Sequence, residues 1–345
     1  MNLSVIILAA GAGTRMRSTK PKVLHRLAGI PMVEHVYNTS KSLGAVQVQV
    51  VYGHGGELLK QQCQHFNVEW CLQDEQLGTA HAVHQASPHI NDENVALVLY
   101  GDVPLIKAET LEQLVSNVSG NNLALLTVNL EDPTGYGRIV RENGKVTAIV
   151  EHKDASDEIK AIKEVNTGIL AVNAAYLNQC LAKIDNNNVQ GEYYLTDIIA
   201  LAVKDGNEVI TTQADFSYEV EGVNDRKQLA RLERIFQHGI ADKLLTDGVS
   251  LADPARIDVR GELKVGTDCF IDVNCVFEGD VTLGNHVSIS TGCVIKNSSI
   301  ADNCIIKPYS VIQSARVDNK TEVGPFARIR PGTHLREHSR VGNFV

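Results

Sequence analysis

Short apolar runs alternate with amphipathic segments over the first two thirds of the chain. The apolar runs have the length of buried strands, and the amphipathic segments carry apolar residues at three- and four-residue spacing, as on one face of a helix. Strands are predicted at residues 3–8, 46–51, 95–100 and 123–128. Helices are predicted at residues 31–43, 109–118 and 193–204. Because the two kinds of segment alternate, we expect a doubly wound, Rossmann-like α/β sheet.

Two further patterns predict a hairpin and a long helix. Residues 138–150 have strand-like halves on either side of Asn143 and Gly144, a pair that suits the positive φ angles of a type I′ turn. This hairpin would project Glu151 from its end. From residue 226 to residue 248, apolar residues fall at three- and four-residue spacing between charges, which predicts an amphipathic helix between two domains.

A six-residue period replaces these patterns in the last third of the chain. This period fits neither an α-helix nor one long strand, but it is typical of a parallel β-helix in which each hexapeptide forms one flat side of a coil. Hexapeptide-repeat proteins, which this segment resembles, have left-handed helices that commonly trimerise. The repeated apolar positions, with two five-residue slips, are Val265, Ile271, Phe277, Leu283, Ile289, Ile295, Ile300, Ile306, Ile312, Val317, Val323, Ile329, Leu335 and Val341.

The same repeat explains four cysteines and raises a question about the end of the chain. The four stand four places after a repeat aliphatic residue, where valine or alanine occurs in other repeats, so we expect core packing rather than thiol chemistry. They are Cys269, Cys275, Cys293 and Cys304. The repeat reaches Val345 without a polar cap, although stacked repeats normally need one. We therefore expect that the β-helix is truncated at its C-terminal end or that something else covers this end.

Composition sets the broad class of the protein. With 345 residues, of which 43% are hydrophobic and 21% charged, the chain has an ordinary globular composition and is long enough for two domains. No apolar run approaches about 18 residues and no signal-peptide pattern opens the chain, so we expect a cytoplasmic protein without a membrane span. The seven cysteines lack C-x-x-C spacing, which disfavours a disulfide framework or a thiolate zinc site. The formal charge of −9 disfavours nucleic acid as a partner.

A cluster of cations follows the first predicted strand. Gly11 and Gly13 end this strand, and glycine lets backbone N–H groups approach an anionic ligand closely. The cations precede Glu34, the first acidic residue of an otherwise acidic chain, and they are Arg15, Arg17, Lys20, Lys22 and Arg26. The segment therefore predicts phosphate binding. It matches neither the Walker loop nor the dinucleotide-binding glycine pattern, which fails at Met16.

The same segment resembles the sugar-1-phosphate nucleotidyltransferase family, through L-A-A-G-x-G-T-R-M at residues 8–16 and P-K at residues 21–22. With further motifs in order, the whole chain resembles the bacterial family of bifunctional N-acetylglucosamine-1-phosphate uridyltransferases and glucosamine-1-phosphate acetyltransferases. These motifs are Y-G-H-G-G at 52–56, Q-x-E-Q-L-G-T at 73–79, Y-G-D-V-P at 100–104, D-P-T-G-Y-G-R at 132–138, V-E-H-K-D-A at 150–155, N-T-G-I at 166–169, G-E-Y-Y-L-T-D at 191–197 and V-E-G-V-N at 220–224.

This resemblance implies a domain division and a set of site residues. It divides the chain into a nucleotidyltransferase domain at residues 1–226, a helical linker at 227–248 and an incomplete acetyltransferase domain, the β-helix, at 249–345. It makes Arg15 and Lys22 the catalytic cations. Ala12 stands where the family often has Lys, from which we expect a weaker phosphate-binding charge but retained activity. The implied substrate-binding residues are Leu8, Ala9, Ala10, Gly11, Lys22, Gln73, Gly78, Thr79, Tyr100, Gly101, Asp102, Gly137, Glu151, Asn166, Asn224 and Arg330.

Asp102 and Asn224 are the predicted ligands of Mg²⁺. Asp102 follows the strand at 95–100, at the edge of the sheet where open α/β proteins bind ligands. The resemblance implies that Asn224 supplies a second oxygen. Two protein oxygens suit Mg²⁺, because this ion keeps several waters and takes further ligands from phosphate. His81 and His84 lack a third ligand at metal spacing, so we expect structural or solvent-facing roles for them.

The resemblance implies Mg²⁺-dependent transfer of UMP from UTP to N-acetylglucosamine-1-phosphate, which gives pyrophosphate and UDP-N-acetylglucosamine, a precursor of peptidoglycan and lipopolysaccharide. The nucleophile is already an anion, so positioning and charge neutralisation suffice without a general base. Full-length family members also transfer acetyl from acetyl-CoA to glucosamine-1-phosphate. We expect no such activity here, because their catalytic histidine lies beyond Val345 and neither His334 nor His338 matches it. Two alternatives stay open: another sugar-1-phosphate nucleotidyltransferase, or a non-catalytic scaffold subunit that senses sugar nucleotides.

Overall fold

The computed structural model describes residues 2–53 and 55–345, and the chain divides into two compact units. The first unit comprises Met1–His25 and Pro31–Arg226. The second comprises Arg26–Ile30 and Lys227–Val345, so the chain enters it twice, first for five residues and then to the end. Within the described residues, no helix combines the length and the apolar character needed to cross a membrane.

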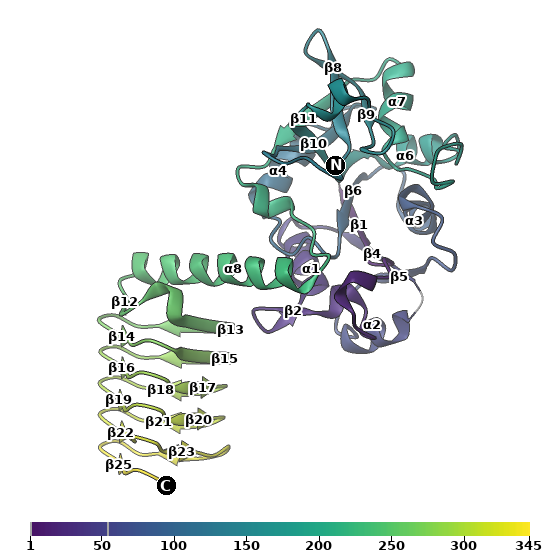
Figure 1. The fold of residues 1–345 in the computed structure, drawn as a ribbon. Helices are drawn as coiled ribbons and strands as arrows, with labels where there is room; N and C mark the ends of the chain where they lie inside the picture. Colours follow the sequence, from purple (N-terminus) through teal and green to yellow (C-terminus); the bar gives the residue numbers. More distant parts are fainter. Residues whose placement is uncertain (1, 54) are drawn as a thin grey trace. The chain divides into compact units, whose positions relative to one another are not determined.

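A mostly parallel sheet forms the centre of the first unit (Figure 1). Its strand order is β11-β7-β10-β6-β1-β4-β5, and the hairpin β8–β9 pairs with β10. The central strand β1 (Leu3–Leu8) is parallel to both neighbours, β4 (Gln47–Tyr52) and β6 (Val95–Tyr100). The other strands are β5 (Glu69–Leu72), β7 (Leu123–Asn129), β8 (Arg138–Glu142), β9 (Lys145–Val150), β10 (Glu164–Asn173) and β11 (Val209–Gln213). The predicted α/β sheet is confirmed, and each predicted strand agrees with an observed one to within a residue at either end.

The side chains of β1 point alternately into two hydrophobic cores. Val5 and Ile7 belong to one core, and Ile6 and Leu8 belong to the other. Successive strand residues face opposite sides of a sheet, so a strand that is apolar throughout needs helices on both faces. The first core receives α1 (Met32–Ser42), α2 (Gly56–Gln62) and α4 (Ala108–Ser116). The second receives α3 (Thr79–Ala86), α6 (Ala174–Leu181) and α7 (Asp197–Lys204).

Two local predictions had different outcomes. The hairpin is confirmed, and its turn residues Asn143 and Gly144 both have positive φ angles, 50° and 80°, as a type I′ turn requires. The helix predicted from residue 193 begins only at Asp197, so the prediction was wrong for its first turn. The reason is tertiary: the Tyr193 N–H donates to the Leu77 carbonyl at 2.8 Å, and the Tyr193 carbonyl accepts from the Ala80 N–H at 2.9 Å.

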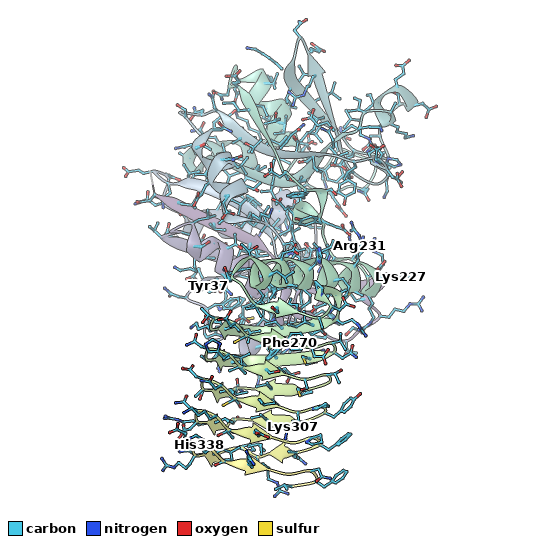
Figure 2. All side chains as sticks on the ribbon, turned by 90° about the vertical axis from the view of Figure 1, so that its left-hand side faces the viewer. Tyr37, Lys227, Arg231, Phe270, Lys307 and His338 are labelled. Carbon is cyan, nitrogen blue, oxygen red and sulfur yellow. The ribbon has the colours of Figure 1, made fainter. Side chains whose placement is uncertain are left out.

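The second unit contains the long helix α8 (Arg226–Thr246) and a stack of short parallel strands (Figures 1 and 2). Paired strands stand 17 or 18 residues apart over most of the stack, as in Ile289 with Ile306 and Val276 with Val294. One curled sheet runs β12 (Ser250–Leu251), β14 (Phe270–Ile271), β16 (Ser288–Ile289), β19 (Ile305–Ile306), β22 (Glu322–Val323) and β25 (Arg340–Val341). The other holds β13 (Ile257–Val265), β15 (Cys275–Leu283), β17 (Val294–Lys296), β18 (Ser299–Ile300), β20 (Val311–Gln313), β21 (Arg316–Val317), β23 (Arg328–Ile329) and β24 (His334–Leu335). This arrangement is consistent with the predicted parallel β-helix, whose left-handed sense stays a prediction.

The repeat positions contribute to the core of this stack, together with cysteines and residues of α8. The aliphatic residues predicted at six-residue spacing are buried or pack against the buried cluster, while Phe270 and His338 are exposed on the outside (Figure 2). All seven cysteines of the chain are free and buried. Burial raises the pKa of the Cys275 thiol to about 12, which keeps it protonated and unreactive at neutral pH. The prediction that the cysteines pack in cores is confirmed.

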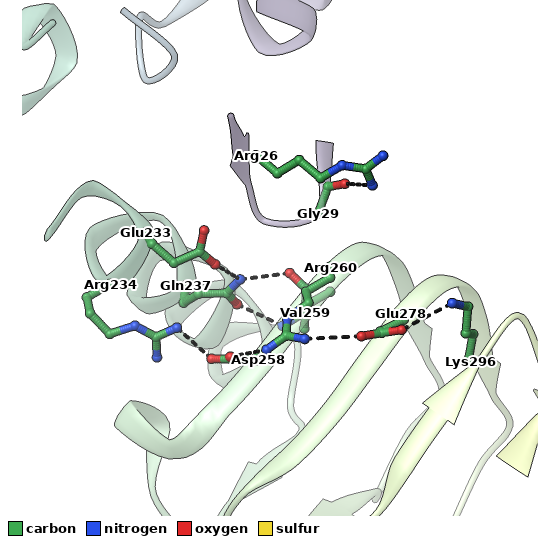
Figure 3. Close-up of polar contacts among 10 residues, drawn as sticks. All are labelled: Arg26, Gly29, Glu233, Arg234, Gln237, Asp258, Val259, Arg260, Glu278 and Lys296. Carbon is green, nitrogen blue, oxygen red and sulfur yellow. Dashed lines mark hydrogen bonds and ion pairs between the residues drawn. The ribbon is translucent and has the colours of Figure 1, made fainter. Parts of the chain in front are cut away.

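The segment Arg26–Ile30 belongs to the second unit through contacts with α8 and β13 (Figure 3). It forms the tip of a small hairpin, β2 (Arg26–Leu27) and β3 (Ile30–Pro31). The Ala28 N–H donates to Glu233 Oε2 at 2.7 Å. Gly29 has a φ of 86°, and a Cβ there would lie 2.9 Å from the Cβ of Arg260. Glycine is therefore required for this close approach.

Candidate active site

A cavity of about 320 Å³ lies at the carboxyl ends of β1 and β6 in the first unit. In open α/β sheets, ligands bind beside the carboxyl ends of adjacent parallel strands. Ten of the predicted substrate residues line this cavity: Leu8, Ala9, Ala10, Gly11, Lys22, Gln73, Gly78, Thr79, Tyr100 and Asp102. Gly101 lies between two of them, and its N–H donates to the Leu8 carbonyl at 2.9 Å, which ties the end of β6 to β1.

The loop after β1 closes onto Lys22 because of one glycine. Gly13 has a φ of 60°, and a Cβ at this position would lie 2.6 Å from the Cβ of Lys22. The short helix η1 (Thr14–Met16) follows and presents Arg15 to solvent. Within the described part of the chain, the Arg15 side chain has no hydrogen-bond or ion-pair partner. Arg15 does not line the cavity, but its guanidinium is available to an anionic ligand.

Three predicted residues from distant parts of the chain meet at the Lys22 ammonium. Lys22 forms an ion pair with Asp102 and donates to Asn224 Oδ1 at 3.2 Å. Lys22 opens the short helix η2 (Lys22–Leu24), and Asp102 follows β6. The segment that carries Asn224 is held by the Val223 N–H, which donates to the Asp102 carbonyl at 2.9 Å. The Lys22 and Asp102 side chains are only 11% and 17% exposed, so their charges interact with little solvent screening.

The oxygens of Asp102 and Asn224 fit the chemistry of Mg²⁺. One carboxylate oxygen and one amide oxygen face the same ammonium group, and hard divalent cations prefer such oxygens. No group of three or more His, Cys, Asp or Glu side chains that could hold a metal occurs among residues 2–53 and 55–345. An ion held by Asp102 and Asn224 would thus take its other ligands from water and substrate, as Mg²⁺ commonly does.

The three residues predicted to hold the amino sugar lie beside one another. The Asn166 N–H donates to the Gly137 carbonyl at 2.9 Å, and a Cβ at Gly137 would lie 3.2 Å from Glu151 Oε1. The pairing of β10 shifts register between Asn166 and Leu170, which interrupts the strand at this point. These three residues do not line the 320 Å³ cavity. Tyr100 lines the cavity and also approaches Gly168, where a Cβ would lie 2.6 Å from the Tyr100 hydroxyl. The Gly168 N–H in turn donates to Asn166 Oδ1 at 2.9 Å.

Burial changes the titration of two groups in this region. The pKa of Glu151 is raised above its ordinary value, first by burial and then by the charges of Asp154 and Asp197. The pKa of Tyr100 is raised by burial, and the charges of Asp102 and Glu151 add to this rise. Tyr100 therefore remains a neutral phenol that can donate a hydrogen bond.

A backbone clamp closes another side of the cavity. Gly78 has a φ of 114°, and a Cβ there would lie 2.5 Å from the Tyr193 carbonyl oxygen. Gln73, which is 2% exposed, donates from Nε2 to the Gly78 carbonyl at 3.1 Å. Gln76 donates to the Ala10 carbonyl at 2.6 Å and so joins this loop to the one after β1. We use the name clamp for residues 77–80 together with residues 192–195.

Four lining residues were not predicted as site residues: Val23, Gln76, Ala82 and Glu192. Gln76 and Glu192 belong to motifs quoted above, but an amide and a surface carboxylate carry no chemical signal of their own. Of the other predictions, His81 bonds to Gln73 and Gln85, and His84 is exposed, as expected for structural and solvent-facing histidines. Arg330 belongs to the second unit and is exposed after β23.

Comparison with known proteins identifies the class of the first unit. Residues 5–168 match the model of the MobA-like NTP transferase domain. The first unit thus contains an NTP transferase domain. Residues 259–345 match the model of the GMPPB C-terminal domain. The NTP transferase match includes the loop after β1, Lys22, Gln73 and Asp102, whereas Asn224 and the 192–195 part of the clamp follow it in the chain.

Among solved structures, one supports the fold of this domain. A Bacillus anthracis protein described as a glucose-1-phosphate thymidylyltransferase, in complex with sucrose, has a TM-score of 0.53 and 21% sequence identity; the match covers 68% of this chain and 94% of that one. A nucleotidyl transferase from Methanothermobacter has a TM-score of 0.48 and 18% identity, covering 68% of this chain and 97% of that one. At this identity, the first comparison supports the fold of the NTP transferase domain.

Proposed function

We propose that this protein transfers a uridylyl group from UTP to N-acetylglucosamine-1-phosphate in a Mg²⁺-dependent reaction, with UDP-N-acetylglucosamine and pyrophosphate as products. The observation that carries the proposal is the meeting of Lys22, Asp102 and Asn224 beside the cavity at the end of β1. The NTP transferase match supports nucleotidyl transfer. The choice of base and sugar rests on the motif resemblance.

The reaction needs charge neutralisation more than it needs a base. The oxygen of the sugar phosphate would bond to the α-phosphorus of UTP, while the bond from that phosphorus to the pyrophosphate oxygen breaks. Lys22 and Arg15 would neutralise charge on the reacting phosphates. Asp102 and Asn224 would hold Mg²⁺, which when bound supplies further positive charge at the phosphate oxygens. For this, Lys22 must exchange its contacts with Asp102 and Asn224 for contacts with substrate.

The remaining residues would select the two substrates. The N–H groups of the Gln73 amide face the Gly78 carbonyl and His81 Nδ1, so Gln73 would recognise the base by accepting a hydrogen bond from its N–H edge through Oε1. Thr79 also lines this cavity. The Glu151 carboxylate and the Asn166 amide would bind the polar groups of the amino sugar, near Gly137.

A second candidate is thymidylyl transfer to glucose-1-phosphate, which the description of the Bacillus anthracis protein suggests. A pyrophosphate-release assay separates the candidates. UTP with N-acetylglucosamine-1-phosphate should give the highest kcat/KM. The pair dTTP and glucose-1-phosphate should give a value at least about tenfold lower, because one substrate group that does not match its binding site lowers kcat/KM by about that factor. The reverse order would favour the second candidate, and no release with any pair would favour a non-catalytic, sugar-nucleotide-sensing scaffold.

The second unit is proposed to act in assembly. Its parallel strands support a β-helix, which we predict to be left-handed. Through this β-helix we expect the chain to form a homotrimer in the cytoplasm. The UDP-N-acetylglucosamine formed would serve peptidoglycan and lipopolysaccharide synthesis.

A further inference from the structure

A second cavity, of about 350 Å³, lies next to the clamp in the first unit. It shares no lining residue with the 320 Å³ cavity described above. Its lining consists of Leu77, Ala80, His81, His84, Leu181, Ile184 and Tyr193. No step of the proposed reaction uses this cavity.

The two cavities lie on opposite sides of one stretch of backbone. Gly78 and Thr79 line the first cavity, whereas the flanking Leu77 and Ala80 line the second. In the other segment of the clamp, Glu192 lines the first cavity and Tyr193 lines the second. The two segments are joined by the Tyr193 bonds to Leu77 and Ala80 and by the Leu195 N–H, which donates to Thr79 Oγ1 at 3.0 Å. A molecule that packs against Leu77 and Tyr193 therefore supports the wall of the first cavity.

A side-chain contact also joins the cavities. His81 lines the second cavity, and its Nδ1 lies 3.2 Å from Nε2 of Gln73, the residue placed to recognise the base. The other ring nitrogen, Nε2, lies 3.1 Å from Nε2 of Gln85. Both neighbours are amide nitrogens, which only donate, and a neutral imidazole accepts at one nitrogen, so the hydrogen bond that couples His81 to Gln73 is the one at Nδ1. A shift of its ring would be transmitted to Gln73, which is buried and already bonded to Gly78.

The lining defines the chemistry of an occupant. Leu181 and Ile184 form a buried aliphatic wall, and Leu77 leaves 37% of its surface exposed. The titratable side chains that face this space are His81, His84 and Tyr193. His84 is exposed, and its ring has no hydrogen-bond or ion-pair partner within the described residues. A cavity of this size suits a small molecule. The apolar walls suit a small molecule with an apolar, preferably aromatic, ring system. The available His84 imidazole suits one acidic group on that molecule.

We propose that this second cavity is a regulatory site for a small amphipathic anion, and that its occupation tightens the binding of UTP by supporting the clamp. The inference rests on the proposed function, because it takes the first cavity as the site of UTP. Coupling between two binding sites is reciprocal, so UTP must tighten binding of the anion by the same factor.

The test uses 8-anilinonaphthalene-1-sulfonate, a fluorescent molecule with an aromatic body and one anionic group, on the full chain. Fluorescence titration should show one saturable site, and saturating UTP with Mg²⁺ should lower the dissociation constant of the probe at least about fivefold. In the converse titration, saturating probe should lower the dissociation constant of UTP by the same factor. Displacement of the probe by UTP, or an unchanged affinity, would overturn the proposal.

Two variants connect the signal to this cavity. His84→Ala should weaken probe binding about tenfold, the typical loss of a charge-assisted hydrogen bond. Ile184→Trp should abolish binding by filling the cavity. The matched control is His89→Ala, since His89 is also exposed and bonds to Gln47 and Gln49 only through its carbonyl. Equal probe binding by wild type and His84→Ala would overturn the assignment even if Ile184→Trp fails to fold.

The outcomes distinguish this inference from the proposed function. Reciprocal coupling of probe and UTP without pyrophosphate release would leave the regulatory site standing and remove the catalytic proposal. Pyrophosphate release without coupling would do the opposite. A protein that does not bind UTP would contradict both.

Discussion

At the scale of single residues, the site depends on a lysine that holds two oxygens together. Lys22 is in contact with Asp102 and Asn224, although these residues are 80 and 202 positions away in the chain. Without a cation between them, an aspartate and an amide oxygen this little exposed would repel each other and lose solvation. In the structure the Lys22 ammonium stabilises the pair, and under the proposed function a divalent cation would take over this role.

Gly78 provides a test of the clamp. Gly78→Ala should raise the KM for UTP about tenfold or more and lower the melting temperature, because the new Cβ would lie 2.5 Å from the Tyr193 carbonyl oxygen. Gly206→Ala is the matched control, since Gly206 also has a positive φ, 79°, but no atom within 4 Å of its added Cβ. Equal effects of the two substitutions on KM would contradict a role for the close approach.

Glu151 provides a test by pH. Its pKa is raised by burial, so it becomes protonated at a higher pH than the ordinary glutamate value of 4.5. The KM for N-acetylglucosamine-1-phosphate should therefore rise as pH falls through this raised pKa, because a neutral acid accepts a sugar hydroxyl hydrogen bond less well than a carboxylate. Glu151→Gln should have a KM about tenfold higher at neutral pH. The ratio of the two KM values should shrink in acid; a ratio that is constant with pH would contradict this role.

Sequence patterns predicted those cavity-lining residues that carry a recognisable chemical type. The glycine loop with its cations indicated Lys22, the strand end indicated Asp102, and both line the 320 Å³ cavity. They could not predict Gln76, whose role depends on one hydrogen bond to the Ala10 carbonyl. That contact joins two loops 66 residues apart, and glutamine is as common on surfaces as in sites.

At the scale of elements, apolar periodicity predicted strands better than segment ends. The side chains of β1 pack into two cores, one on each face of the sheet. The run of six apolar or small residues in its sequence directly predicts a strand buried on both faces. The start of α7 was missed because Tyr193 uses its N–H and carbonyl in the clamp. A local pattern contains no information about Leu77 and Ala80, which supply the partners for those groups.

Gln237 provides a test of how α8 attaches to strand β13. Its side chain accepts from the Val259 N–H and donates to the Val259 carbonyl, each at 2.8 Å, and it is buried (Figure 3). Gln237→Leu would leave two buried backbone groups without partners, at a cost of about 2–5 kcal/mol in the free energy of unfolding. Lys243→Leu, at an exposed position of the same helix, should change it by less than about 0.5 kcal/mol. Denaturant titration gives both values, and similar values would contradict the account.

At the scale of the whole molecule, the order of segments along the chain differs from their grouping into two compact units. The motifs predicted one domain up to residue 226, and the structure adds that Arg26–Ile30, which follows Lys22 closely, packs with the second unit. The contact that explains this joins Ala28 to Glu233, 205 residues later. Three covalent crossings therefore connect the units, where the sequence indicated one.

The stack of strands provides a prediction about assembly. We expect a homotrimer, with a mass of about 113 kDa against 37.6 kDa for one chain. Sedimentation equilibrium or light scattering would measure it. A concentration-independent mass of one chain would contradict the proposed trimer and leave the nucleotidyl transfer proposal untouched.

The central claim is that Asp102 acts with Lys22 and Asn224 in metal-dependent nucleotidyl transfer. The measurement is pyrophosphate release from UTP and N-acetylglucosamine-1-phosphate with Mg²⁺, for wild type, Asp102→Ala and the control Glu112→Ala, whose carboxylate is exposed on α4. Wild type and control should release pyrophosphate only when both substrates are present, and Asp102→Ala should be at least about 100-fold slower with its fold intact. Release at the wild-type rate by folded Asp102→Ala would contradict the account.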